Sequence, residues 1–134
     1  MKRILIVEDD PAVQRALRHC ARAEGHRADG FDSVEDAESA LLKESYDLLI
    51  TDFSLRTDRT GLDLLRFIRD RNLAIAVILI SGSGENGLER RALELGAVAF
   101  IKKPFPVTTF TAACRAALAG RPAQMPQSGA GAGQ

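Results

Sequence analysis

The chain has 134 residues, of which 46% are hydrophobic and 27% are charged, and these proportions are typical of one globular domain. Its 18 lysines and arginines equal its 18 aspartates and glutamates, so no basic excess favours binding to nucleic acid or to a membrane surface. No apolar stretch approaches the roughly 20 residues of a membrane-spanning helix, and no secretory signal begins the chain. We therefore expect a cytoplasmic protein that binds neither nucleic acid nor membrane.

Five short apolar runs alternate with segments of helical periodicity. The runs lie at about residues 3–7, 27–31, 47–52, 75–81 and 97–102. Runs of isoleucine, leucine and valine of this length are typical of strands buried on both faces, and their alternation with helices is typical of a parallel sheet. We predict an α/β fold with a five-stranded, doubly wound parallel sheet flanked by five helices.

The first two helices carry clear start signals. Asp10 is expected to cap the first helix and Pro11 to take its first position, and Gly25 follows its end. Ser33 is expected to cap the second helix. The inward faces are predicted to be Val13, Ala16, Leu17 and Cys20 in the first helix, and Val34, Ala37 and Leu41 in the second.

Three further helices are expected from about Gly61, from about Gly84 to Leu95, and from about Pro106 to Gly120. Their inward residues are predicted to be Leu62, Leu65 and Ile68, then Leu88, Ala92 and Leu95, then Val107, Phe110, Cys114 and Ala117. Residues 121–134 are mostly proline, glycine, alanine and glutamine, so we expect one domain over residues 1–120 followed by a disordered tail.

Polar and charged residues stand at the ends of four expected strands. Glu8 and Asp9 follow the first strand, Asp52 ends the third, Ser81 ends the fourth and Lys103 follows the fifth. Parallel strands end at the same edge of a sheet, and ligands bind in the crevice at that edge. We therefore expect these side chains to meet in one site.

The charges of this site favour a divalent cation. Three carboxylates and one lysine leave a net charge that one such ion would neutralise. Mg²⁺ prefers oxygen ligands and leaves room for phosphate oxygens. An aspartate can act as a nucleophile toward a phosphoryl group, and Asp52 is the best candidate, with the Ser81 hydroxyl able to donate to a phosphoryl oxygen.

The order and spacing of these residues resemble the receiver domains of bacterial response regulators, the phosphoacceptors of two-component signalling. The resemblance covers about residues 2–119, and within the family the chain is similar to the chemotaxis regulator type. It implies the sheet order 2-1-3-4-5, which composition alone does not supply. The matching segments run from Ile4 to Pro11, from Asp47 to Asp52, from Val77 to Gly82 and from Lys103 to Phe105.

The resemblance also implies a metal and a phosphorylation site. Asp52 would receive a phosphoryl group from a phosphohistidine. Mg²⁺, or Mn²⁺ in its place, would be held by Asp9, Asp52 and the backbone carbonyl of Ser54, with Glu8 acting largely through metal-bound water. The domain would catalyse only its own phosphoryl transfer and autodephosphorylation, so it would not be an enzyme in the usual sense.

Other positions would carry the response to phosphorylation. Ser81 and Lys103 would contact the phosphoryl group, and the bond from Lys103 to the following proline would be cis. Phe100 would be the aromatic residue that turns inward when Ser81 moves. Ser54 and Ser83 hold the positions where the family tunes water attack on the phosphoryl group.

The chain departs from the family pattern in two places. Arg56 stands where the family usually has a proline, and Gly61 comes one residue late. The segment from Gly96 to Phe100 lacks the acidic residues that many DNA-binding receivers use in dimer salt bridges, which disfavours that dimer.

Three rival functions fit the residues less well. A haloacid-dehalogenase-like phosphatase needs a second aspartate two residues after the nucleophile, where this chain has Ser54. A flavin-binding protein would need a phosphate loop rich in serine and threonine after the first strand, and this chain lacks such a loop there. A pseudo-receiver that binds partners without phosphorylation usually lacks an acidic-site residue, and this chain lacks none.

We therefore predict a stand-alone receiver in a phosphorelay. Its partners would be a sensor histidine kinase or phosphotransfer protein and a downstream output protein, bound through a switching surface formed by the fourth helix, fifth strand and fifth helix. No room for a DNA-binding domain follows Gly120, so an adaptor, a phosphate sink and a detached receiver segment all remain open.

Overall fold

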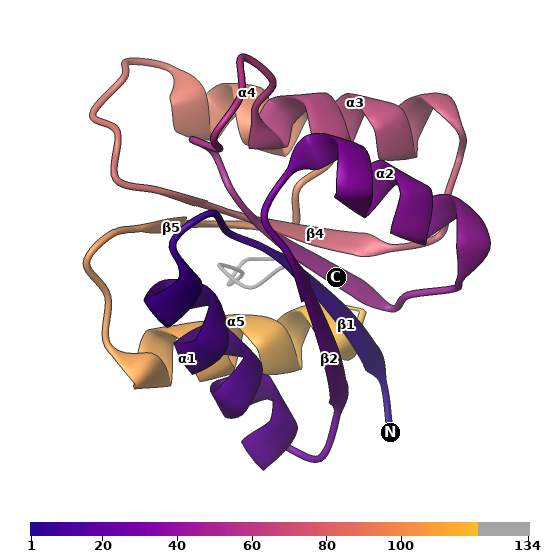
Figure 1. Ribbon diagram of the computed structural model, residues 1–134. Coiled ribbons are helices and arrows are strands. Elements are labelled where there is room, and N and C mark those ends of the chain that lie inside the picture. Colours follow the sequence, from indigo (N-terminus) through magenta and orange to yellow (C-terminus); the bar gives the residue numbers. More distant parts are fainter. Residues whose placement is uncertain (121–134) are drawn as a thin grey trace, which may run out of the picture.

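The computed structural model describes residues 1–120, and the expected disordered tail at 121–134 lies outside the described residues. The described chain forms one parallel sheet with helices on both faces (Figure 1). The strand order is β2-β1-β3-β4-β5, which confirms the order that the family resemblance implies. The strands are β1 (Arg3–Val7), β2 (Arg27–Phe31), β3 (Leu48–Asp52), β4 (Ala76–Ser81) and β5 (Ala99–Lys102).

The helices form two layers around the sheet. In Figure 1 the first and last helices lie below the sheet, and the other three lie above it. The helices are α1 (Pro11–Ala23), α2 (Val34–Lys43), α3 (Gly61–Asp70), α4 (Leu88–Glu94) and α5 (Val107–Leu118).

Alternate residues of the central strands feed two separate apolar clusters. In β1, Leu5 and Val7 pack with α2, α3 and α4, whereas Ile4 and Ile6 pack with α1 and α5. All four are at most 1% exposed. Because successive side chains of a strand point to opposite faces, a strand covered by helices on both sides must be apolar throughout.

Local start signals fix the beginnings of the first three helices. The Asp10 side chain accepts hydrogen bonds from the backbone N–H groups of Ala12 and Val13 at 2.9 and 3.3 Å. Ser33 caps α2 in the same way, and Thr60 caps α3 in a reciprocal box with Asp63. The predicted caps at Asp10 and Ser33 are confirmed.

Two elements begin more than one residue later than the sequence predicts. Helix α4 begins at Leu88 rather than near Gly84, because Gly87 holds a φ of +83° and residues 84–87 form a loop instead of a helical turn. Strand β5 begins at Ala99, two residues later than expected, after Gly96 turns the chain with a φ of +109°.

Two residues expected in the core are exposed. Ala16 faces outward, because the buried side of α1 runs along Leu17 and Ala21 with Val13 and Cys20 half-buried. Val107 is 61% exposed, since it is the first residue of α5 and the inward face of that helix begins at Phe110.

Both predicted core cysteines lie on helices that pack against the sheet. Cys114 is buried, Cys20 is half-buried, and neither is in a disulfide.

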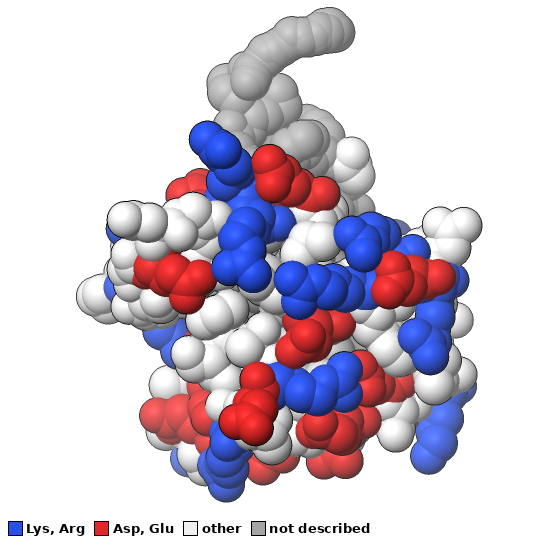
Figure 2. Space-filling model, turned by 90° about the horizontal axis from the view of Figure 1, so that it is seen from above, with Lys and Arg blue, Asp and Glu red and all other residues white. Residues whose placement is uncertain are grey.

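The face formed by α2, α3 and α4 carries charges of both signs. Figure 2, which views the molecule from above Figure 1, shows lysine and arginine interspersed with aspartate and glutamate. On α3, Arg66 forms a salt bridge with Asp63 at 3.5 Å, and Arg69 forms another with Asp70 at 3.2 Å.

None of the helices within residues 1–120 has the length and apolar character needed to cross a membrane.

Gly61 sets how closely α3 approaches the end of β3. Its backbone N–H donates to the Phe53 carbonyl at 3.0 Å. A Cβ atom built at this residue would lie 2.5 Å from the carbonyl oxygen of Asp52 and 2.7 Å from Leu79 Cδ1. A side chain here would therefore push on the backbone of the residue that ends β3.

We predict that Gly61→Ala lowers the free energy of unfolding by about 1 to 3 kcal/mol, because the added methyl group overpacks the junction between β3 and α3. Chemical denaturation checks this value. Gly84→Ala is the matched control, since a Cβ atom at Gly84 has nothing within 4 Å. Equal stability of the two variants would contradict the assigned role of Gly61.

Candidate functional site

The candidate site lies at the carboxyl ends of β1 and β3, the two central strands from which the sheet is extended in opposite directions. Glu8 directly follows β1, and its backbone N–H donates to the carbonyl of Phe31 at the end of β2 at 3.0 Å. Asp52 is the last residue of β3. Both carboxylates are buried, with 2% of Glu8 and 7% of Asp52 exposed.

The structure brings the three predicted carboxylates together. One oxygen from each of Glu8, Asp9 and Asp52 lies within 4.8 Å of the others, and Asp9 is half-buried. Carboxylate oxygens at this spacing fit the ligand set that a hard divalent cation requires. The donor atoms are thus suitable for Mg²⁺.

Lys103 supplies the positive charge of the site. Its Nζ donates to Asp52 Oδ2 at 2.8 Å and to Glu8 Oε1 at 3.2 Å. Its backbone N–H donates to the carbonyl of Ser81 at 2.9 Å, which continues the pairing of β4 with β5. The neighbouring Lys102 is exposed, as expected for adjacent residues at a strand end. The predicted cis bond between Lys103 and Pro104 is confirmed.

Burial and neighbouring charges shift the pKa values of Glu8 and Lys103. Burial raises the pKa of Glu8, with a further contribution from the nearby Asp52 charge, and this outweighs the hydrogen bonds from Asp10 and Lys103. Burial lowers the pKa of Lys103, but its hydrogen bonds and attraction to Asp52 and Glu8 raise it overall. The lysine therefore stays charged, and Glu8 is more easily protonated than an exposed glutamate.

The structure contains two polar contacts around the site that the sequence did not predict. The Gln14 side-chain amide donates to the carbonyls of Glu8 and Phe31, both at 3.0 Å, and so ties α1 to the ends of β1 and β2. Arg56 donates from Nη2 to the carbonyl of Asp9 at 2.7 Å. A polar residue inside the apolar stripe of α1 is a signal for the first contact, whereas the second joins loops far apart in the chain.

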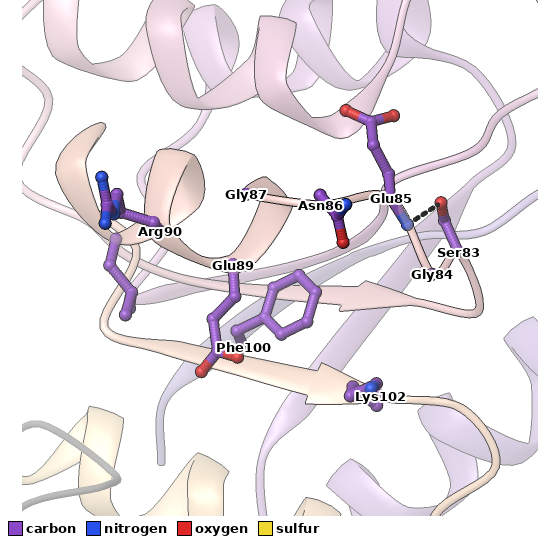
Figure 3. A pocket seen from close by; sticks show the side chains of 10 residues that line it. Ser83, Gly84, Glu85, Asn86, Gly87, Glu89, Arg90, Phe100 and Lys102 are labelled. Carbon is purple, nitrogen blue, oxygen red and sulfur yellow. Dashed lines mark hydrogen bonds between the residues drawn. The ribbon is translucent and has the colours of Figure 1, made fainter.

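Ser81 lies at the end of β4 and is 1% exposed. Its Oγ accepts a hydrogen bond from the Ser83 N–H at 2.9 Å. The Ser83 Oγ in turn accepts from the Glu85 N–H at 3.0 Å (Figure 3). The loop after β4 is therefore fastened to the Ser81 hydroxyl through two successive hydrogen bonds.

Phe100 and Ser83 line a hollow that is separate from the acidic crevice. This hollow has a volume of about 490 Å³ and lies between the loop after β4, α4 and β5. Phe100 is half-buried, and Figure 3 shows its ring projecting from β5 into this space beside Glu89. Ser81 links the two regions, because its backbone contacts Lys103 and its hydroxyl contacts Ser83.

Ser54 lies in the loop after β3 and its side chain is exposed. Apart from Ser54, the predicted site residues fall into three groups. Glu8, Asp9, Asp52 and Lys103 form the acidic crevice, Ser81 stands beside it, and Phe100 and Ser83 line the hollow near α4. This arrangement can bind a cation at the carboxylates while the lysine meets a negatively charged group.

We predict that Glu8→Gln changes how stability depends on pH. In the metal-free parent, the raised pKa of Glu8 means that its contribution is fully present below the unfolded-state value near 4.5 and is lost as pH rises through the folded-state value. Relative to the parent, the variant should therefore gain stability as pH rises from 4.5 through that window. Urea unfolding in chelator across this range measures the difference, and a constant difference would contradict the prediction.

Sequence and structure comparisons identify related proteins. Residues 4–115 match the family described as the response regulator receiver domain. The response regulator protein PmrA of Pseudomonas aeruginosa is 33% identical over 114 residues, covering 85% of this chain and 51% of PmrA. The KDP operon transcriptional regulatory protein KdpE of Escherichia coli is 31% identical over 118 residues, covering 88% of this chain and 52% of KdpE.

A solved structure agrees with these matches. The non-phosphorylated HemR receiver domain of Leptospira biflexa superposes with a TM-score of 0.81 at 26% identity, covering 88% of this chain and 94% of that chain. The chain spans about a quarter to about half of the length of the curated relatives that it matches. The matched family is one of signal receivers rather than catalytic enzymes, and this chain belongs to the response regulator receiver domains of two-component systems.

Proposed function

We propose that the domain is a phosphoacceptor whose Asp52 is reversibly phosphorylated by a phosphohistidine with the help of Mg²⁺. The observation that carries this proposal is the contact of 2.8 Å between Lys103 Nζ and Asp52 Oδ2 beside two further carboxylates. A buried aspartate with a fixed cation at one oxygen is suited to carry additional negative charge. We assign the whole receiver to residues 1–120.

The residues that would hold the ion are Asp9, Asp52 and the backbone carbonyl of Ser54, with Glu8 acting through a bound water. Bound Mg²⁺, or Mn²⁺ in its place, supplies positive charge to the oxygens of the transferred group. The fit of the site rests on carboxylate oxygens within 4.8 Å of one another. The burial of Glu8 and Asp52 strengthens their attraction for a cation, because surrounding water screens them little.

The transfer step needs only one bond to form and one to break. A carboxylate oxygen of Asp52 bonds to phosphorus as the bond from phosphorus to the donor imidazole nitrogen breaks, and the electron pair leaves with the imidazole. Lys103, already at Asp52, would shift its hydrogen bonds to a phosphoryl oxygen. Water attack on the aspartyl phosphate reverses the modification, at a rate that Ser54 and Ser83 would tune.

The Ser81 hydroxyl would report phosphorylation to the surface of the domain. It accepts a hydrogen bond from Ser83, so its own hydrogen is free to be donated to a phosphoryl oxygen. Movement of Ser81 toward the phosphoryl group would strain the bond to Ser83 and shift the loop beside α4. Phe100 would then turn inward into the space that this loop vacates.

This change would switch a surface formed by α4, β5 and α5. Reversing a population from 1:99 to 99:1 takes about 5.5 kcal/mol of differential stabilisation, which a phosphoryl group with lysine, hydroxyl and metal contacts can supply together with a partner. The proposed partners are a sensor histidine kinase or phosphotransfer protein upstream and an output protein downstream. All would meet the domain in the cytoplasm.

We predict that the full chain gains the mass of one phosphoryl group when it is incubated with acetyl phosphate and Mg²⁺. Asp52→Asn should gain none, since an amide is not a nucleophile here and the substitution preserves shape. Intact-mass spectrometry measures both. A parent protein that stays unmodified, or an adduct that persists in Asp52→Asn or in chelator, would overturn the proposed function.

A further inference from the structure

Arg56 connects the two loops that carry the expected metal ligands. It lies in the loop after β3, and its Nη2 donates to the backbone carbonyl of Asp9, in the loop after β1, at 2.7 Å. The two residues are 47 positions apart in the chain. Among the described residues, this is the only side-chain hydrogen bond recorded between the two loops.

The bond from Arg56 to Asp9 joins the two loops on which the expected metal ligands stand. The carboxylate of Asp9 stands on one loop, whereas the carbonyl of Ser54 stands on the other, two residues before Arg56. Asp52, at the base of the second loop, is already fixed by β3 and Lys103. The separation between the other two ligands therefore depends on how the loops are held against each other.

The loop after β3 is anchored on its other side as well. Arg59 Nη1 donates to Glu38 Oε1 on α2 at 3.0 Å, and it lies 3.5 Å from Glu35 on the same helix. Directly before Arg56, Leu55 is buried in the apolar cluster under α2 and α3, with 9% of its surface exposed. The backbone of Arg56 is therefore held by Leu55 on one side and by Arg59 on the other. Its side chain can then hold the two loops at a fixed separation.

The bond to Asp9 leaves the carboxylates free. Arg56 donates to a main-chain carbonyl, so it occupies no carboxylate oxygen that a cation would use. Its positive charge opposes cation binding, but Arg56 is exposed and water screens that charge strongly. The benefit of holding the ligands at the right separation is therefore the larger effect.

We propose that Arg56 is a positioning residue for divalent cation binding, because it braces the loop of Asp9 against the loop of Ser54. This inference rests on the proposed function, since it assigns the cation to the same acidic crevice. Arg56 itself touches neither the cation nor the phosphoryl group. Its contribution is to reduce the loop motion that cation binding would otherwise have to arrest.

The test compares Arg56→Met with Arg56→Lys in the full chain. Methionine keeps much of the aliphatic stem but has no donor and no charge, whereas lysine keeps one donor and the charge. Calorimetric titration with Mg²⁺ should show about three- to tenfold weaker binding in Arg56→Met, the loss expected for one hydrogen bond. Arg56→Lys should recover most of the affinity of the parent.

A second measurement follows the loops without any metal. Hydrogen exchange in chelator should show faster exchange for residues 9–12 and 53–57 in Arg56→Met, with the rest of the sheet unchanged. Arg90→Met is the matched control, because Arg90 is an exposed arginine on α4 whose side chain makes no hydrogen bond within the part of the chain described. This control removes the same charge without touching either loop.

The possible outcomes distinguish the positioning role of Arg56 from the proposed function. Tighter or unchanged Mg²⁺ binding in Arg56→Met, or unchanged exchange of both loops, would overturn the role of Arg56. A parent protein that binds no Mg²⁺ would overturn the proposed function, and the positioning role with it. An equal change of affinity in Arg56→Met and Arg90→Met would show that the effect is not specific to the contact with Asp9, which also overturns the role.

Discussion

The contact of Lys103 with Asp52 and Glu8 is the interaction on which the site depends. Two carboxylates that are 7% and 2% exposed lie beside a third, and their mutual repulsion opposes folding. The lysine offsets part of this repulsion at distances of 2.8 and 3.2 Å. The remaining negative charge would attract a cation, so the proposed cation binding and the cost to folding have the same physical origin.

The parallel sheet supplies the geometry for this contact. Glu8, Asp52 and Lys103 come from β1, β3 and the end of β5, yet all emerge at one edge because parallel strands end together. Gly61 allows α3 to begin against the carbonyl of Asp52, and Gln14 ties the ends of β1 and β2. Apolar burial holds the strands, and a few polar contacts near the crevice set its detailed shape.

Much of this arrangement follows from the sequence because its causes are local or topological. The apolar runs and the caps at Asp10 and Ser33 predict the elements, and the shared strand edge predicts that Glu8, Asp9, Asp52 and Lys103 meet. The sheet order came from family resemblance rather than from the pattern. The roles of the site residues in phosphorylation stay predictions.

Other features depend on tertiary contacts that no local pattern encodes. The bond from Arg56 to Asp9 joins residues 47 positions apart and requires the packed loops before it can form. The late start of α4 reflects a loop in which side-chain hydrogen bonds of Ser83 and a left-handed Gly87 compete with helical turns. The outward direction of Ala16 depends on the angle at which α1 packs, which apolar spacing alone left open.

The central claim is that Lys103 balances the buried carboxylates in the absence of metal. The most direct measurement is the free energy of unfolding of Lys103→Met, in chelator and in Mg²⁺, beside Lys102→Met as the exposed neighbour. Because Lys103 is 30% exposed, we expect Lys103→Met to be destabilised by about 1 to 3 kcal/mol in chelator. Mg²⁺ should stabilise this variant more than it stabilises the parent. A Lys103→Met variant as stable in chelator as the parent would contradict the account.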